Sequence, residues 1–194
     1  MKTTHLIASA LIASVFAAAA QADIFTPAAW SASLTPVNPS NTSSTSNITN
    51  PTASSIKFEY EFVGPGVYQT PGVFATFSNL ATQDGPLTLD WNYSWFHAYF
   101  QVSASLTFFT DGPNGVSENQ VYQWNYYGPT EMPTSGTVTL DLHSGYSWGL
   151  RVGGRNEDAT YVVSGNVTLT ETPAPGALAL VGAAGLMGSR RRRG

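Results

Sequence analysis

Apolar and polar residues alternate along residues 56–62, and this alternation limits the fold more than any other feature of the chain. Every second residue from Ile56 to Phe62 is large and apolar, whereas Lys57, Glu59 and Glu61 occupy the positions between them. A period of two is typical of a β-strand with one face in a core and one face in water. No part of residues 56–171 carries a sustained helical period, so the sequence predicts an all-β fold.

Further stretches rich in aromatic and β-branched residues follow at short intervals. The predicted strands cover residues 56–62, 73–78, 87–93, 96–109, 120–127, 136–142, 146–152 and 161–170, and the stretch 96–109 is long enough to bend or divide. Turn signals lie between them, at Gly64-Pro65-Gly66, Asp84-Gly85-Pro86, Asp111-Gly112-Pro113-Asn114-Gly115 and Gly153-Gly154. We therefore predict one antiparallel β-sandwich of jelly-roll type over residues 56–171.

The charge and cysteine content of the chain exclude several classes of function. All 12 acidic residues lie between Asp23 and Glu171, where Lys57, Arg151 and Arg155 are the three cations, so this part carries a net charge of −9. Such a surface repels phosphate, and we expect no nucleic-acid partner. The chain has no cysteine, which excludes disulfides and cysteine-ligated zinc.

Residues 23–55 differ in composition from the predicted sandwich. From Ser31 to Ser55 the chain consists mainly of Ser, Thr, Asn and Pro, with isolated apolar residues. A segment of this kind buries too little surface to offset the entropy lost on ordering. We predict a flexible low-complexity linker here, and an O-glycosylated spacer is the functional alternative.

The first 22 residues have the three parts of a secretory signal peptide. Lys2 precedes an uncharged run over residues 6–20, which forms the signal helix, and Ala20 and Ala22 supply the small side chains that signal peptidase reads. Asp23 is the expected first residue after cleavage. The alternative is a transmembrane anchor, which the Ala-rich run and the cleavage site disfavour.

The last 23 residues, 172–194, also have three parts in a fixed order. Pro173, Ala174 and Pro175 precede a short apolar helix over residues 176–188, which is shorter than the ~20 residues that span a bilayer. The positive cluster that follows would stay on the cytoplasmic side of a membrane. It consists of Arg190, Arg191, Arg192 and Arg193. The alternative is a plain tail anchor with stop-transfer arginines.

This order of proline motif, apolar helix and arginine cluster resembles the PEP-CTERM sorting signal of Gram-negative bacteria, with Pro-Ala-Pro in place of the usual Pro-Glu-Pro. The resemblance implies an exosortase-type processing enzyme as a partner and transient tethering to the inner membrane. It also implies a final location at the cell surface or outside the cell, and association with extracellular polysaccharide. The strands and glycines at the end of the predicted sandwich are similar to those of β-sandwich domains found before such signals.

Two rows of aromatic residues are candidates for stacking on sugar rings. Trp91, Tyr93 and Trp95 share one face of a predicted strand, and a second row shares a face of another. The second row consists of Tyr122, Trp124 and Tyr126. Exposed rows of this kind would form a carbohydrate-binding module. The alternative is packing in the core, which we favour because a domain of this size needs at least one row to fill its interior.

No recognisable metal or catalytic motif is present. Acidic turn residues offer a weak calcium alternative, but no Asp-x-Asp-x-Asp-Gly loop occurs, so ordinary turn chemistry is favoured and no cofactor is expected. These residues are Asp84, Asp111, Asn114, Glu118, Asn156, Glu157 and Asp158. His97 and His143 lack metal-ligand spacing.

The acidic residues of the strands leave one enzymatic alternative open. A small secreted polysaccharide-active enzyme would need two converging carboxylates, drawn from Glu59, Glu61, Asp90, Glu131 and Asp141. Glu59 and Glu61 are expected on the wet face of the first strand. We predict a non-enzymatic surface or matrix protein, with a carbohydrate-binding module and this enzyme as the alternatives.

Overall fold

The computed structural model describes residues 24–36, 44–63, 73–97, 102–125, 134–156 and 162–172. Among these residues it contains ten strands and one short 3-10 helix, η1 (Pro27–Ala29). The strands are β1 (Ser31–Pro36), β2 (Thr45–Thr52), β3 (Ser55–Val63), β4 (Val73–Leu80), β5 (Gly85–His97), β6 (Val102–Gly112), β7 (Gly115–Asn125), β8 (Ser135–Leu142), β9 (Ser147–Asn156) and β10 (Val162–Glu171). The predicted all-β class is confirmed for this part of the chain.

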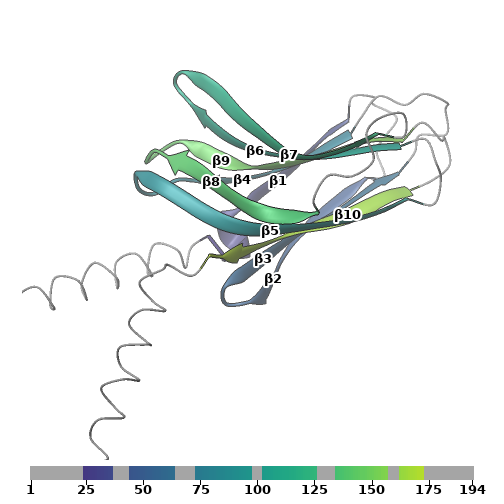
Figure 1. Cartoon of the computed structure of the whole chain (residues 1–194), viewed down its shortest axis with the longest axis horizontal. Helices are drawn as coiled ribbons and strands as arrows, with labels where there is room; N and C mark the ends of the chain where they lie inside the picture. Colours follow the sequence, from purple (N-terminus) through teal and green to yellow (C-terminus); the bar gives the residue numbers. More distant parts are fainter. Residues whose placement is uncertain are drawn as a thin grey trace, which may run out of the picture.

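The strands form two five-stranded antiparallel sheets that face each other (Figure 1). The first sheet has the order β1-β4-β9-β6-β7, and the second sheet has the order β2-β3-β10-β5-β8. Successive strands from β3 to β6 and from β7 to β10 lie in alternate sheets, which is the connectivity expected of a jelly roll. The predicted β-sandwich is thus confirmed, with β1 and β2 added at one edge.

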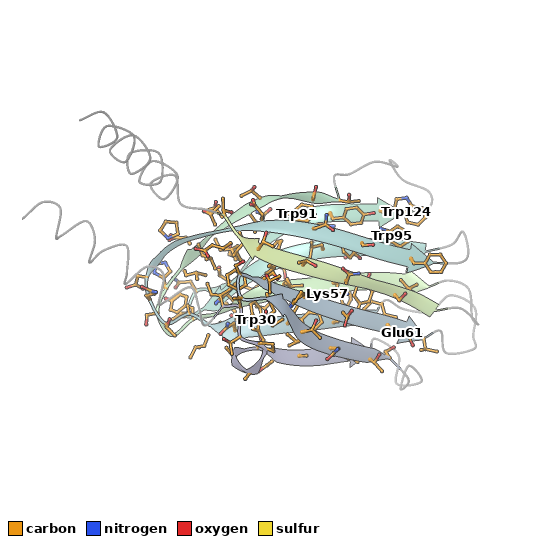
Figure 2. The ribbon with its side chains drawn as sticks, turned by 90° about the horizontal axis from the view of Figure 1, so that it is seen from below. Trp30, Lys57, Glu61, Trp91, Trp95 and Trp124 are labelled. Atoms are coloured by element: carbon orange, nitrogen blue, oxygen red, sulfur yellow. The ribbon has the colours of Figure 1, made fainter. Side chains whose placement is uncertain are left out.

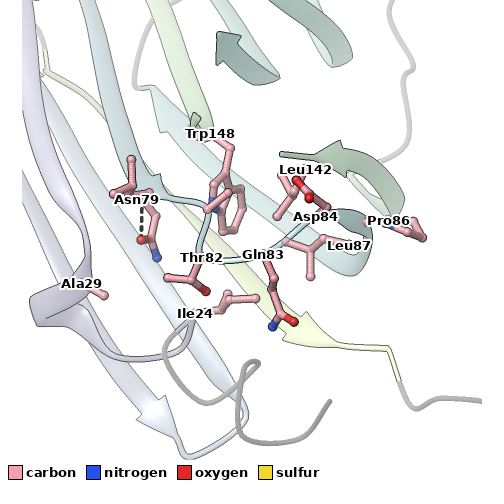
Figure 3. A pocket seen from close by; sticks show the side chains of 13 residues that line it. Ile24, Ala29, Asn79, Thr82, Gln83, Asp84, Pro86, Leu87, Leu142 and Trp148 are labelled. Atoms are coloured by element: carbon pink, nitrogen blue, oxygen red, sulfur yellow. Dashed lines mark hydrogen bonds between the residues drawn. The ribbon is translucent and has the colours of Figure 1, made fainter. Parts of the chain in front are cut away.

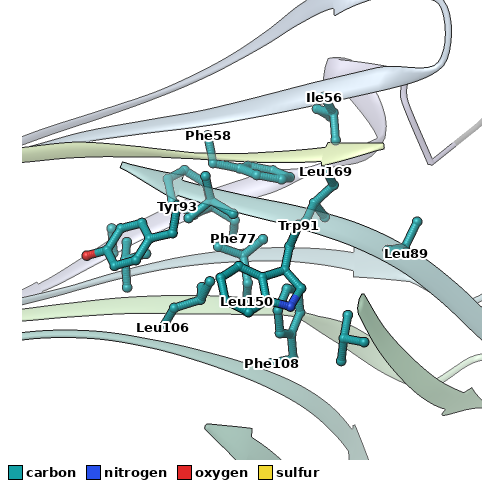
Figure 4. Packing of buried hydrophobic residues seen from close by; sticks show 14 of the residues in the cluster. Ile56, Phe58, Phe77, Leu89, Trp91, Tyr93, Leu106, Phe108, Leu150 and Leu169 are labelled. Carbon is teal, nitrogen blue, oxygen red and sulfur yellow. The ribbon is translucent and has the colours of Figure 1, made fainter. Parts of the chain in front are cut away.

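The core lies between the sheets and is formed by every second residue of the strands. In β3 the side chains of Ile56, Phe58 and Phe62 are buried, as the period of two predicts. They meet residues of the first sheet such as Phe77 and Leu150, and the rings of Phe58 and Phe77 are 4.9 Å apart (Figure 4). This burial of aromatic and aliphatic surface is the main favourable term in the stability of the domain.

The segment predicted to be a flexible linker contributes two strands, so that prediction is wrong for residues 31–36 and 45–52. β1 pairs with β4 at the edge of the first sheet, and β2 pairs with β3 at the edge of the second. Trp30 anchors this segment, because its ring is buried between Phe58 and Trp148 and its Nε1 donates to the carbonyl of Ile24 at 2.6 Å. An edge strand needs few apolar residues, so its polar composition concealed it.

Two further details differ from the predicted strands and turns. The stretch 96–109 divides, because β5 ends at His97 and β6 begins at Val102. Gly153-Gly154 is not a turn but lies inside β9, where the ring of Phe74 lies across Gly153. A glycine in a strand allows such a close approach, because it has no side chain. The predicted turn at 111–115 is confirmed, with Gly115 at a φ of 98°.

The first and last described residues lie at the same end of the sandwich. Ile24 lies beside the β4–β5 turn, and Thr172 follows β10, whose Glu171 pairs with Leu89 of β5 (Figure 1). The predicted signal peptide and sorting signal, residues 1–22 and 172–194, lie outside the described residues except for Thr172. In the part that is described, no helix is long and apolar enough to cross a membrane.

Candidate functional site

A polar groove of about 420 Å³ lies on the outer face of the second sheet. It crosses β2, β3, β10 and β5 near the end of the sandwich that is opposite Thr172. Its lining combines carboxylates, amides and hydroxyls with aromatic rings. The lining residues are Thr45, Asn47, Glu59, Tyr60, Glu61, Ser94, Trp95, Phe96, Ser164, Gly165 and Asn166. We refer to this hollow as the outer groove.

Strand register places the polar residues of the outer groove in two rows across the sheet. In one row Glu61 of β3 lies between Thr45 of β2 and Ser164 of β10, and Ser164 is followed by Phe96 of β5. The second row runs parallel to the first, two residues further along each strand. It consists of Asn47, Glu59, Asn166 and Ser94. The same alternation that buries one face of each strand therefore directs these side chains outward.

Glu59 is held in place by its neighbours on the sheet face. One carboxylate oxygen accepts a hydrogen bond from Lys57 Nζ at 2.6 Å, and the other accepts one from Asn47 Nδ2 at 3.3 Å. The hydrogen bond from Lys57 lowers the pKa of Glu59 below its ordinary value, against a smaller opposing effect of burial. Glu59 is thus ionised and already paired, which suits a fixed hydrogen-bond acceptor.

Glu61 and Phe96 are the exposed carboxylate and the exposed aromatic ring of the outer groove. Glu61 is exposed near the end of β3 (Figure 2). Among the described residues no hydrogen bond or ion pair engages its carboxylate. Phe96 is 67% exposed, the largest value among the exposed large apolar side chains of the described residues. Two strand spacings separate them, so their Cα atoms lie about 10 Å apart. A ring lying flat on Phe96 would therefore have a carboxylate within reach of its edge.

The described members of the two aromatic rows belong to the core or pack against it, so the sugar-stacking role that the sequence left open does not hold for the buried ones. Trp91, Tyr93 and Tyr122 are each no more than 5% exposed, and the rings of Tyr93 and Tyr122 are 4.9 Å apart. Trp95 and Trp124 are half-buried, and their rings are 5.1 Å apart. Tyr126 lies outside the described residues. Packing in the core, the alternative that the sequence favoured, accounts for these residues.

A pair of buried tyrosines lies directly beneath the outer groove. The hydroxyl oxygens of Tyr60 and Tyr93 are 2.7 Å apart, and burial raises the pKa of both. Gly165 makes room for this pair, because a Cβ atom there would lie 2.6 Å from the Tyr60 hydroxyl. Tyr122 extends the cluster by accepting a hydrogen bond from Trp95 Nε1 at 2.6 Å. The groove floor is therefore rigidly supported from the core.

A second pocket, of about 350 Å³, opens at the end of the sandwich where the described chain begins and ends (Figure 3). Its walls are mainly apolar and include Ile24, Leu80, Leu142 and Trp148. Its one carboxylate, that of Asp84, already accepts a hydrogen bond from the backbone N–H of Ser144 at 2.8 Å. Its other polar side chains, those of Asn79, Thr82 and Gln83, all come from the end of β4 and the turn after it. The outer groove gathers polar side chains from four strands, so we take it as the candidate site.

Of the candidate catalytic residues that the structure describes, two lie together and two lie elsewhere on the second sheet. Glu59 and Glu61 share the outer groove, whereas Asp90 accepts a hydrogen bond from Thr137 and Asp141 lies 4.0 Å from His143. Within the described ranges no group of three or more His, Cys, Asp or Glu side chains could hold a metal ion. Glu131, Glu157 and Asp158 lie outside those ranges, as does the site of signal cleavage.

The sequence did not single out the residues that complete the outer groove. Asn47, Ser94, Ser164 and Asn166 are small polar residues that occur throughout the chain, and nothing in their spacing marks them as a set. Phe96 lies in a predicted strand, and nothing in the sequence gives it a role. The one available signal was the period of two in 87–97, which puts Ser94 and Phe96 on the face opposite Tyr93 and Trp95.

No family model matches the chain, and no curated protein matches it. Among solved structures it is similar to TmCBM61 in complex with β-1,4-galactotriose (TM-score 0.36, 10% identity, 79% of this chain and 95% of that one). It is similar to the C-terminal family 22 carbohydrate binding module of Clostridium thermocellum Xyn10B (TM-score 0.34, 7% identity, 79% and 92%). A third match is the glycoside hydrolase domain of Endo-D from Streptococcus pneumoniae (TM-score 0.31, 11% identity, 75% and 22%). Values this low identify no family for the chain.

Proposed function

We propose that this chain is an exported, non-catalytic protein of the cell surface or extracellular matrix, and that it binds extracellular polysaccharide through the outer groove. The observation that carries the proposal is the composition of that groove. Acceptors and amide donors from Asn47, Glu59, Glu61 and Asn166 surround a hollow with the exposed ring of Phe96 at its rim. Sugars present hydroxyl groups around an apolar ring face, so a site that combines fixed polar groups with an aromatic surface suits them.

The position of the outer groove supports a role at a surface. Thr172 lies eight residue positions after Ser164 of the groove, which corresponds to about 26 Å along the strand. A chain tethered through residues 173–194 would therefore hold the groove away from the tether. A polymer outside the cell would meet this end of the sandwich first.

The groove carboxylates are better suited to binding than to glycoside hydrolysis. A hydrolase needs one carboxylic acid that keeps its proton until it protonates the leaving group. The pKa of Glu59 is lowered by Lys57, which is the opposite of what a proton donor requires. Glu59 and Glu61 also lie on one strand, side by side, rather than on facing walls.

Affinity electrophoresis of the full-length chain in gels that contain bacterial exopolysaccharides would test the binding. We expect retardation of the wild-type chain and a loss of affinity of at least about fivefold in Phe96→Ala, equivalent to about 1 kcal/mol. Val116→Ala is the matched control, because Val116 is 52% exposed at the start of β7 in the other sheet. Unchanged mobility of the wild-type chain with every polysaccharide would refute the proposal.

We also propose that residues 172–194 act as an exosortase-type sorting signal. In a host that has such an enzyme, replacing Pro173 and Pro175 by Ala should leave an uncut, membrane-associated form. The readouts are the size of the protein and its fractionation. Pro51→Ala is the control, since Pro51 lies in β2 and outside the tail. Normal processing of the tail variant would contradict this part of the proposal.

A further inference from the structure

The outer face of the second sheet has a strong negative bias. Its outward positions carry five charged residues among those that the structure describes. These are Lys57, Glu59, Glu61, Asp90 and Asp141. The one cation among them, Lys57, is paired with Glu59 at 2.6 Å. An acidic polysaccharide would therefore meet repulsion on this face and find no free cation within the described part of it.

Within the outer groove, Glu61 is the carboxylate that remains open to a ligand. Glu59 is engaged by Lys57 and Asn47, whereas Glu61 is exposed and lies between the hydroxyl-bearing residues Thr45 and Ser164. An ionised carboxylate accepts hydrogen bonds and donates none, and its strongest partners are cationic donors. The Glu61 carboxylate is thus suited to bind a positively charged nitrogen of a ligand.

We infer that the outer groove selects glycans that carry free amino groups, with Glu61 pairing to the protonated amine of a hexosamine whose ring lies on Phe96. This inference rests on the proposed function, because it names the class of sugar for the same site. The Cα atoms of Glu61 and Phe96 lie about 10 Å apart, with only the small Ser164 between them in the row, which leaves room for one sugar ring over this part of the sheet. N-acetylated sugars and uronic acids lack the charge that this position favours.

The test compares three oligosaccharides of equal length by isothermal titration calorimetry with the full-length chain. They are a deacetylated glucosamine hexamer, its N-acetylated counterpart and an oligogalacturonate. We expect the cationic hexamer to bind best and the acidic one least. In Glu61→Gln the advantage of the cationic hexamer should disappear through a roughly two- to fivefold loss of its affinity, which is the range for one exposed ion pair.

Two controls separate charge selection from other causes. Asp111→Asn removes one negative charge from the exposed end of β6 in the first sheet, so it should keep the preference for the cationic hexamer. Poly-lysine supplies positive charge without a sugar ring, so Phe96→Ala should weaken the glucosamine hexamer and leave poly-lysine binding unchanged. The preference should also shrink in 0.5 M salt, because exposed charges are screened.

The outcomes distinguish this inference from the proposed function. If the N-acetylated hexamer binds as tightly as the cationic one, the inference is overturned and polysaccharide binding stands. If Glu61→Gln leaves the preference intact, or Asp111→Asn abolishes it as well, selection does not arise at Glu61 and the inference is likewise overturned. If none of the oligosaccharides or the exopolysaccharides binds, both the inference and the proposed function fail.

Discussion

The hydroxyl groups of Tyr60 and Tyr93 meet at 2.7 Å inside the sandwich, where each ring is less than 5% exposed. The two residues come from β3 and β5, which are separated in the sheet by β10. Their hydrogen bond therefore links strands that share no backbone ladder. It also joins the floor of the outer groove to the core.

Removing one of these hydroxyls leaves the other without this partner. We expect Tyr60→Phe and Tyr93→Phe each to lower the free energy of unfolding by about 1–2 kcal/mol, and the double variant to lose less than the sum. Urea denaturation followed by tryptophan fluorescence measures these values. Tyr146→Phe is the control and should change stability by less than about 0.5 kcal/mol. Additive losses would show that the two hydroxyls are not coupled.

The same pair makes folding sensitive to high pH. Burial raises the pKa of Tyr60 and of Tyr93 above the ordinary value of 10.0, so the ionised forms are favoured in the unfolded chain. The contribution of the pair is complete below about pH 10 and declines as the pH rises beyond it. Absorbance at 295 nm should show these tyrosines ionising together with unfolding, and in the Y60F/Y93F variant stability should fall less steeply. Ionisation well before unfolding would contradict the burial.

Trp30 tests whether the N-terminal segment belongs to the folded domain. Its indole is 7% exposed and packs against Phe58 and Trp148. We expect Trp30→Ala to destabilise the domain by about 3–5 kcal/mol, because it leaves a cavity beneath β1. Ser33→Ala, at an exposed position of the same strand, should cost less than about 0.5 kcal/mol. Equal stability of the two variants in thermal melts would support the prediction that this segment is a flexible linker.

Substitution of Gly165 tests how closely β10 packs against the Tyr60 side chain and the backbone of β5 beneath the outer groove. A Cβ atom at this position would lie 2.6 Å from the Tyr60 hydroxyl and 2.7 Å from the backbone carbonyl of Ser94. We expect Gly165→Ala to destabilise the domain by about 1–3 kcal/mol, since the carbonyl cannot move aside without distorting β5. Ser164→Ala, on the outward neighbour, should leave the melting temperature nearly unchanged and weaken glycan binding. A neutral Gly165→Ala would show that the strands have room to separate.

The sequence predicts the fold better than it predicts the site, because a buried core leaves a clear pattern of large apolar residues and a polar groove leaves none. Burial of Ile56 and Phe58 demands large apolar residues at every second position, and this pattern is visible without a structure. The strand β2 leaves only Ile48 packed against the core, so its polar residues resemble a linker. The paired glycines 153 and 154 resemble a turn because the aromatic rings that cover them come from other strands.

The outer groove escaped prediction because it arises from register between strands distant in the sequence. Asn47 and Asn166 are brought beside Glu59 by pairing across β2, β3 and β10. None of these neighbours is close in sequence, and each is an ordinary polar residue at an exposed or half-buried position. The aromatic rows are easier to recognise in the sequence because large rings are rare, but the size of these rings is also what places them in the core.

The central position of β10 determines how the domain would respond to mechanical load. β10 is the last strand of the part of the chain that the structure describes, and it is hydrogen-bonded to β3 along one side and to β5 along the other. A pull on the chain beyond Thr172 acts along this strand, so both ladders would bear the force at once and would have to slide together. A terminal strand at the edge of a sheet would oppose the same pull with one ladder instead of two. The order of strands thus gives the domain a shear-resistant attachment point at the end from which it would be held.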